Sequence, residues 1–249
     1  MLVVAFIGYN VYWNQRTQNR WDKVTNETRG AFNEIKNLVV KYPPDRVYRF
    51  INFPPRQHFG AKFFKLFFEP YDMASGIWPM EVPSYIDRDK ILFLLQMNGH
   101  IYNDPEVAKK AVSTPWEHFY VAQFYLLIGD NQNGISELDK STASVSDEKI
   151  HYFAAVTYRK LGLSSKAIEE LKKVIQINEY SKYAIDTYKL LSFLSFKTGD
   201  LDSAIKYLEK AVYLNNKDVD AMGNLAQLYE DKGEVDKAKE IRKRASIGH

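Results

Sequence analysis

Residues 155–174, AVTYRKLGLSSKAIEELKKV, decide the fold of more than half of this chain. A small residue and a tyrosine, Ala155 and Tyr158, precede Gly162, and Ala167 follows it. Small residues let two helices approach closely and a glycine turns the chain between them, so the pattern predicts a helical hairpin. Turn glycines recur at positions 129, 162, 199 and 233, with separations of 33, 37 and 34 residues. A period of this size predicts an array of hairpins.

The segment from Thr114 to Ser246 resembles the tetratricopeptide family, whose repeat has 34 residues. The best unit gives Ala155, Tyr158, Gly162, Ala167, Leu171 and Val174, and the last gives Leu225, Ala226, Tyr229, Gly233, Ala238 and Ala245. The third unit has Ser195 in place of the tyrosine, and the first has Gly134 in place of the helix alanine. The resemblance implies a mainly α fold, an α-solenoid of about four hairpins over residues 114–249. The 37-residue step predicts a longer helix or a looser connection around residues 174–183.

The last predicted helix is mostly charged. Arg242 stands where Leu208 packs in the third unit. Because each repeat buries one face on the next, a polar outer face is typical of a capping helix, and we expect the array to end here.

In the tetratricopeptide family the first helix of each pair lines a concave face that binds extended peptides or partner helices. Projecting those groove positions onto this sequence gives Trp116, Phe119, Gln123, Lys149, Tyr152, Val156, Arg159, Lys189, Phe193, Phe196 and Gln227. Aromatic residues with a few cations suit an apolar peptide that carries an acidic group. The alternative is that several of these aromatic residues are buried against the N-terminal half. The family's Lys and Asn clamp for a C-terminal carboxylate is absent, so we do not expect binding of chaperone tails.

Catalysis is not expected. The chain has no cysteine, which excludes disulfides, thiolate zinc sites and thiol nucleophiles. Its five histidines share no helix at metal-binding spacing, and no serine, histidine and aspartate arrangement is suggested. We therefore predict no catalytic residue, no metal and no cofactor.

The chain opens with an apolar run, residues 1–13, that ends in Tyr12 and Trp13 before a charged flank. Aromatic residues beside charges are typical of the point where a helix leaves the bilayer. The run is shorter than the roughly 20 residues that a span needs, so we interpret it as the end of a transmembrane or anchor helix. A buried first helix and an uncleaved signal anchor are the alternatives.

Residues 14–113 are predicted to form a small α/β domain. Apolar residues at helical spacing predict a helix over residues 21–41, and residues 47–53 predict a strand. A short aromatic helix is expected over residues 59–68, and Pro70, Pro79 and Pro83 predict a long loop over residues 69–89. Asn98-Gly99 between apolar runs predicts a hairpin, and with it a sheet of about three strands.

The same region is basic. Lys and Arg outnumber Asp and Glu between residues 14 and 66. Arg46, Arg49, Arg56 and Lys62 are the candidate contacts for an anionic lipid or a glycan. These cations spread over helix, strand and loop without a nucleic-acid-binding fold, so no nucleic-acid partner is expected. A solvated basic surface without a ligand is the alternative.

Residues 2–103 also resemble, through loose motifs such as Asn52-Phe53-Pro54-Pro55, the soluble tails of bacterial membrane proteins related to lipid-linked-sugar glycosyltransferases. The leading hypothesis is a membrane-tethered module with a protein or peptide partner in the concave groove and its N-terminal segment at a membrane surface. The alternative is an accessory extracytoplasmic domain of such a glycosyltransferase. An extracytoplasmic side of the membrane is expected, although cations after the apolar run, Arg16 and Arg20, are more typical of the cytoplasmic side.

Overall fold

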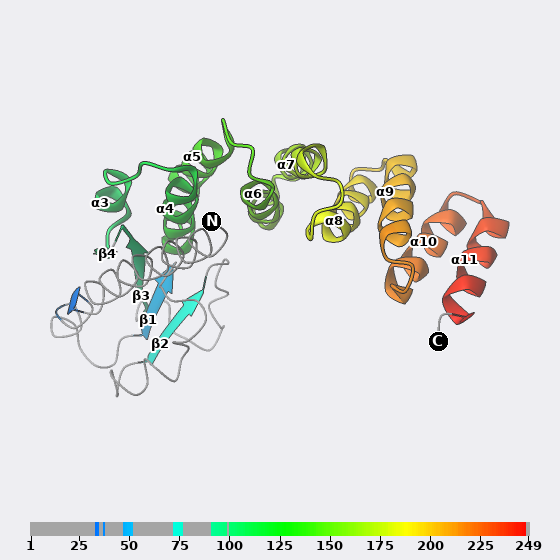
Figure 1. Ribbon diagram of the computed structural model, residues 1–249, viewed down its shortest axis with the longest axis horizontal. Helices are drawn as coiled ribbons and strands as arrows, with labels where there is room; N and C mark the ends of the chain where they lie inside the picture. The colour runs from blue at the N-terminus through cyan, green and yellow to red at the C-terminus, as the bar shows by residue number, and fades with distance from the viewer. Residues whose placement is uncertain are drawn as a thin grey trace, which may run out of the picture. The chain divides into compact units, whose positions relative to one another are not determined.

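The computed structural model describes residues 33–34, 37, 47–51, 72–76, 91–98 and 100–247. The chain divides into two compact units, Met1–Ser141 and Thr142–His249. Figure 1 labels the helices and strands along the chain. The predicted fold class, mainly α with an α-solenoid after a small α/β region, is confirmed.

The described part of the first unit contains a sheet in the order β2-β1-β3-β4. Its strands are β1 (Val47–Ile51), β2 (Asp72–Gly76), β3 (Ile91–Met97) and β4 (His100–Tyr102). β1 is parallel to both β2 and β3, and β3 is antiparallel to β4. β3 has parallel and antiparallel neighbours, and its apolar residues are almost all buried, as expected for a central strand. The predicted hairpin is confirmed, and Asn98 adopts the positive φ of 55° that such a turn needs.

β2 corrects the prediction of a loop over residues 69–89. Its sequence, Asp-Met-Ala-Ser-Gly, has little β-propensity, because aspartate, alanine and glycine are all depleted in strands. The strand forms through its parallel pairing with β1, from Val47↔Asp72 to Ile51↔Gly76. This long-range pairing gives the described sheet a strand more than predicted.

Part of the predicted helix over residues 21–41 is described, at residues 33, 34 and 37, and all three are helical. Glu34 accepts a hydrogen bond of 2.5 Å from the backbone N–H of Ile101 in β4, and its other oxygen lies 2.8 Å from Nδ1 of His100. These bonds tie the helical residue Glu34 to the sheet edge at β4. The apolar run of residues 1–13 and the predicted helix over residues 59–68 lie outside the described residues.

The first unit continues with α3 (Pro105–Lys109), α4 (Pro115–Ile128) and α5 (Asn131–Thr142). Thr114, the predicted start of the array, is the N-cap of α4 and forms a capping box with Glu117. The Tyr125 hydroxyl donates to Glu106 over 2.5 Å, which ties α4 to α3.

Gly134 explains why the first repeat departs from the family pattern. A Cβ atom at this position would lie 2.6 Å from the side chain of Leu126 and 3.3 Å from the carbonyl oxygen of Ala122. Leu126 of α4 fills the space that an alanine side chain takes in the other repeats. The glycine therefore keeps α5 close to α4.

The second unit consists of three hairpins. They are α6 (Glu148–Lys160) with α7 (Ser164–Ile177), α8 (Ala184–Lys197) with α9 (Leu201–Leu214), and α10 (Val219–Asp231) with α11 (Val235–Ile247). Gly162, Gly199 and Gly233 end the first helix of each pair with φ between 76° and 84°, and Gly129 does so in the first unit with φ of 91°. Glycine takes this left-handed conformation at no steric cost, so the predicted turns are confirmed.

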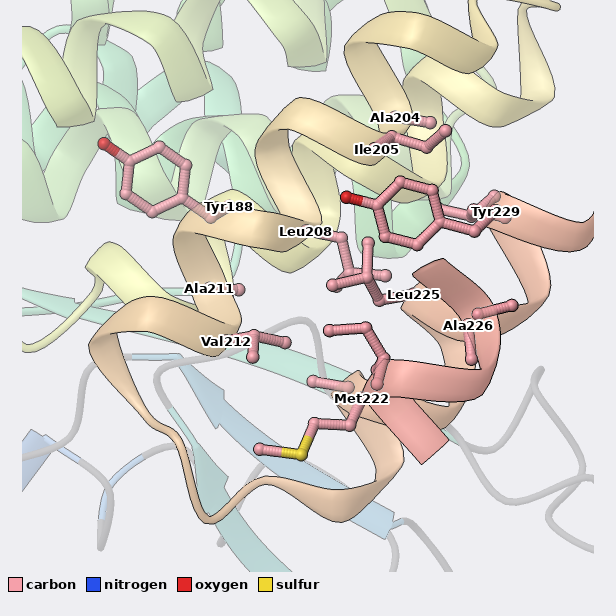
Figure 2. Packing of buried hydrophobic residues seen from close by; sticks show 14 of the residues in the cluster. Tyr188, Ala204, Ile205, Leu208, Ala211, Val212, Met222, Leu225, Ala226 and Tyr229 are labelled. Carbon is pink, nitrogen blue, oxygen red and sulfur yellow. The ribbon is translucent and has the colours of Figure 1, made fainter. Parts of the chain in front are cut away.

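Small and large residues interlock in the core of the last two hairpins (Figure 2). Leu208 and Leu225 point toward each other from α9 and α10, with Met222 beside them, and all three are almost fully buried. Alanines at positions 204, 211, 221, 226 and 238 are at most 1% exposed. Their small side chains let the backbones approach, which is the packing that the sequence pattern predicted.

The 37-residue step is explained by the connection between α7 and α8. α7 and α9 have 14 residues each, so the second helix is not longer. The connection runs from Asn178 to Tyr183 and is closed by local bonds, such as the one from Tyr180 N–H to the Asn178 side chain over 3.1 Å. The looser connection is the correct alternative.

Every hairpin has an equivalent pair of positions, one on each helix, and the residues at this pair differ from hairpin to hairpin. We call it the hairpin pair; it consists of the residues 11 before and 8 after the turn glycine. Its members are His118 and Glu137, His151 and Glu170, Tyr188 and Tyr207, and Met222 and Ile241. Nδ1 of the histidine lies 2.6 Å from the carboxylate in the first pair and 2.5 Å in the second. In the third pair the ring centroids lie 6.4 Å apart.

α11 has the polar outer face that the sequence predicts. Ala238 and Ile241 are buried, whereas Arg242 is exposed and donates to Glu230 of α10 over 2.9 Å. Within the described residues, none of the helices combines the length and the apolar character needed to cross a membrane.

A candidate partner-binding face on the first helices

The predicted groove residues lie on α4, α6, α8 and α10, the first helices of the four hairpins. Those of α4 belong to the first unit and the others to the second. We therefore describe the two sets separately.

On α4 the predicted residues are largely covered. Phe119 is fully buried, Gln123 is 2% exposed and Trp116 is half-buried. Trp116 packs its ring against Phe119 and Tyr120, with centroids 5.7 and 5.8 Å apart. Phe119 is thus a buried aromatic residue and Gln123 is buried as well, so Trp116 is the most exposed of the three.

An aromatic cluster forms where α6 meets the connection before α8. Tyr152 stacks on Tyr183 with ring centroids 4.9 Å apart and an interplanar angle of 26°. Phe153 meets the edge of Tyr183 at 6.0 Å. Lys149 and Lys182 place their ammonium groups over these rings, at 5.8 and 5.0 Å. The cluster therefore combines apolar area with positive charge.

Phe153 and Tyr183 were not predicted as site residues. Phe153 lies beside the groove position of Tyr152, and Tyr183 belongs to the extra residues of the 37-residue step. That departure from the 34-residue period was the available signal, because inserted residues in a repeat array often lie on one face.

Two phenylalanines of α8 are the exposed apolar part of this face. Phe193 and Phe196 are 45% and 47% exposed. Lys197 holds its ammonium group 5.8 Å from the ring centroid of Phe193. Exposed aromatic residues beside cations are typical of partner-binding surfaces. Val156 of α6 is buried at 7% exposure, and Gln227 of α10 is exposed.

The cations of the face differ in their partners. Lys189 donates to Asp218, the N-cap of α10, over 2.7 Å, and this bond holds the pKa of Asp218 below its ordinary value. Lys189 therefore links neighbouring hairpins. The half-buried Arg159 has a buried Nε without a hydrogen-bond partner among the described residues.

Tyr152 has a raised pKa, because burial and the charge of Asp186 both oppose its ionisation. Its hydroxyl stays neutral near pH 7 and can donate a hydrogen bond to an acceptor on a partner. Within the described residues, Tyr152, Arg159 and Asp186 give the face polar groups beside its apolar rings.

The predicted basic contacts are mostly outside the described residues. Arg46, Arg56 and Lys62 are among the residues that the structure does not describe, and Arg49 lies within β1. Across the described ranges, the structure has no group of three or more histidine, aspartate or glutamate side chains placed to hold a metal ion.

Comparisons with known proteins agree with the hairpin geometry. A tetratricopeptide repeat model matches residues 195–246, and a second one matches residues 148–180. The chain carries tetratricopeptide repeats. Both matches lie in the second unit, and arrays of such repeats present extended surfaces to protein partners. This supports a protein-interaction scaffold.

The individual relatives are distant. The uncharacterized protein ycf37 of Pyropia yezoensis is 29% identical over 125 residues, which make up 48% of this chain and 65% of that protein. The chain thus spans less than two thirds of that relative's length. Among solved structures, MamA has a TM-score of 0.49 at 22% identity over 57% of this chain and 82% of its own. MamA MSR-1 has a TM-score of 0.47 at 18% identity, over 59% and 85%.

The two family models begin at residue 148 or later. The resemblance of residues 2–103 to glycosyltransferase tails therefore stays a prediction.

Proposed function

We propose that the first-helix face of the second unit binds an extended or helical segment of a partner protein. The observation that carries this proposal is the pair of exposed rings on α8, Phe193 and Phe196. Solvent exposure of two neighbouring phenylalanines is unfavourable by itself, and a partner that covers them gains the free energy of burying both rings.

The chemistry of the face favours an apolar segment with an acidic group. Phe193 and Phe196 of α8 supply apolar area. Lys197 at the end of α8 and Arg159 of α6 supply positive charge. The stacked rings of Tyr152 and Tyr183 form a rigid surface that loses little entropy on binding. Lys189 contributes less, because its charge is already paired with Asp218.

The test is comparative capture from native extract with wild-type protein and with the double variant Phe193→Ser, Phe196→Ser. A matched control is Ile177→Ser with Val235→Ser, which removes two similarly exposed apolar residues from α7 and α11. We expect one specific protein to bind to the wild type and to the control variant but not to the phenylalanine variant. Equal capture by all three folded proteins would contradict the proposal.

We also propose that residues 1–13 attach the module to a membrane. The support is the apolar run that ends in Tyr12 and Trp13. The test compares sedimentation with membranes for the chain with and without these residues. We expect only the longer chain to sediment, with the shorter one remaining folded. Unfolding or aggregation of the shorter chain would instead indicate that the run packs in the protein core.

A further inference from the structure

The second unit also has a recess, which lies mainly between its second helices α9 and α11. It has a volume of about 620 Å³ and is lined by residues of α9 and α11, with Leu225 and Tyr229 contributed by α10. Ligand sites of several hundred cubic ångströms are usual in proteins. None of its lining residues belongs to the first-helix face described above.

The charge of this recess follows from the change in the hairpin pair. Each second helix carries a cation 11 residues after its turn glycine, and these are Lys140, Lys173, Lys210 and Arg244. In the first two hairpins the glutamate of the hairpin pair accepts a bond from this lysine, over 2.6 Å from Lys140 and 2.9 Å from Lys173. In the last two hairpins that glutamate is replaced by Tyr207 and Ile241.

Lys210 and Arg244 therefore line the recess without the carboxylate that neutralises their counterparts. Lys206, one helical turn before Lys210, lines it as well. None of these three cations has an ion-pair partner within the part of the chain that the structure describes. Two carboxylates also line the recess: Glu209, which accepts the hydroxyl of Tyr229, and Glu240. Lys237, a fourth cation of the lining, is paired with Glu234, so cations still outnumber acids in the lining.

The walls and the floor of the recess differ in character. Lys206 and Lys210 lie on α9 and Arg244 lies on α11, so cations flank both sides. Between them the lining contains apolar residues, Leu225 and Ile241, that are also part of the core. Tyr180 and Tyr213 complete the lining and are 72% and 77% exposed. Tyr180 comes from the looser connection between α7 and α8.

We propose that this recess binds a short acidic segment of a partner protein. Carboxylates on the segment meet Lys206, Lys210 and Arg244, and an apolar side chain between them rests on Leu225 and Ile241 beside the two tyrosine rings. An acidic peptide is favoured because it supplies both parts at once: negative charges for two walls and an apolar group for the floor.

The test is fluorescence anisotropy with a short fluorescein-labelled peptide in which Glu alternates with Phe. We expect Lys210→Glu with Arg244→Glu to weaken its binding about tenfold, since each surface ion pair contributes modestly and two are reversed. The matched control is Lys172→Glu with Lys243→Glu, which makes the same charge change on α7 and α11 outside the recess. The control and the Phe193→Ser, Phe196→Ser variant are expected to bind like wild type.

Three further binding measurements test which chemical groups the recess recognises. Peptides with Gln for Glu, or with Ser for Phe, are each expected to lose binding. Equal weakening by the control variant would overturn the proposal, because it would indicate only a general charge effect. Phosphatidylglycerol vesicles that bind through Lys210 and Arg244 when the peptide does not would also overturn it and assign the recess to lipid. If the Glu variants fail to fold by circular dichroism, Lys210→Gln with Arg244→Gln replaces them, with a smaller loss expected.

Discussion

Nδ1 of His151 lies 2.5 Å from Oε2 of Glu170, and both side chains are buried between α6 and α7. The other ring nitrogen, Nε2, lies 2.9 Å from the carbonyl oxygen of Val145. Both neighbours are acceptors, so both nitrogens must donate, and a ring that donates twice is protonated. Burial opposes the charge of His151, but the bonds to Glu170 and Val145 outweigh it and raise the pKa above its ordinary value.

The pH dependence of stability follows from this pair. The stabilisation that His151 adds to the free energy of unfolding is complete below the histidine pKa of the unfolded chain, about 6.5. It is lost as the pH rises through the higher pKa of the folded state. Burial also opposes the charge of Glu170, yet hydrogen bonds from His151 and Lys173 lower its pKa. The stabilisation that Glu170 adds to the free energy of unfolding is complete above the glutamate pKa of the unfolded chain, about 4.3. It is lost as the pH falls through the lower pKa of the folded state.

His151→Gln is therefore expected to lower the free energy of unfolding by about 3 kcal/mol at about pH 5.5, and by clearly less at about pH 9. Urea unfolding at the two pH values measures the difference. His118→Gln serves as the comparison and should show a smaller effect, because His118 is 30% exposed beside its partner Glu137. A loss for His151→Gln that is the same at both pH values would contradict a protonated ring.

Gly134 and Gly223 allow a matched test of helix glycines. Gly134→Ala places a Cβ 2.6 Å from Leu126 and is expected to lower the free energy of unfolding by about 1–3 kcal/mol. Gly223 lies within α10, and a Cβ there meets nothing within 4 Å. Gly223→Ala is expected to raise the free energy of unfolding by about 0.5–1 kcal/mol. Thermal or urea unfolding of the two variants measures whether each change raises or lowers the free energy of unfolding. A stabilising Gly134→Ala would show that Leu126 moves aside without cost.

The hairpin pair of the last repeat can be converted to that of the second. Ile241→Glu alone buries a carboxylate beside Met222 and is expected to lower the free energy of unfolding by about 3 kcal/mol or more. Adding Met222→His restores the His and Glu pair found in α6 and α7, and should recover about 1–2 kcal/mol. A double-mutant cycle in urea measures this coupling. Strictly additive losses would show that the pair depends on surroundings that only α6 and α7 provide.

Asp218 has two roles that substitutions can separate. One oxygen caps α10 by accepting from Ala221 N–H over 2.9 Å, and the other accepts from Lys189. Asp218→Ala is expected to lower the free energy of unfolding by about 1–2 kcal/mol. Asp218→Asn keeps a capping oxygen and should lose less than half of that. Because the pKa of Asp218 is lowered in the folded protein, the stability advantage of the wild type over Asp218→Asn should shrink as the pH falls through the folded pKa. Urea unfolding at acidic pH measures this change.

The array was predictable because its determinants are local and repeated. Gly129, Gly162, Gly199 and Gly233 mark the turns, and alanines mark the close contacts between helices. Asn98-Gly99 marked the hairpin for the same reason. β2 was not predictable, since its five residues carry no strand pattern and depend on β1, more than 20 positions away.

The sequence predicted which helix positions carry the candidate site, but not which of those side chains are exposed. Family positions identified Phe193 and Phe196, which are exposed, and also Phe119 and Val156, which are buried. Burial depends on neighbours that the repeat pattern does not specify. The His and Glu pairs, by contrast, repeat with the array, because His118 and His151, like Glu137 and Glu170, are 33 residues apart. That recurrence is visible in the sequence once the hairpin register is known.

The hairpin pair turns from charged to apolar between α6 and α11, and this gives the second unit two different weak points. Alkali removes the proton that joins α6 to α7, whereas cooling weakens the apolar contacts that hold α8 to α11 together. Because the stability of a repeat array is approximately a sum of repeat and neighbour terms, we expect the α6–α7 hairpin to open first in a basic solution and the hairpins from α8 to α11 to lose more stability in the cold. A single melting temperature therefore describes this array only at one pH, and the order in which its helices detach is set by the solvent.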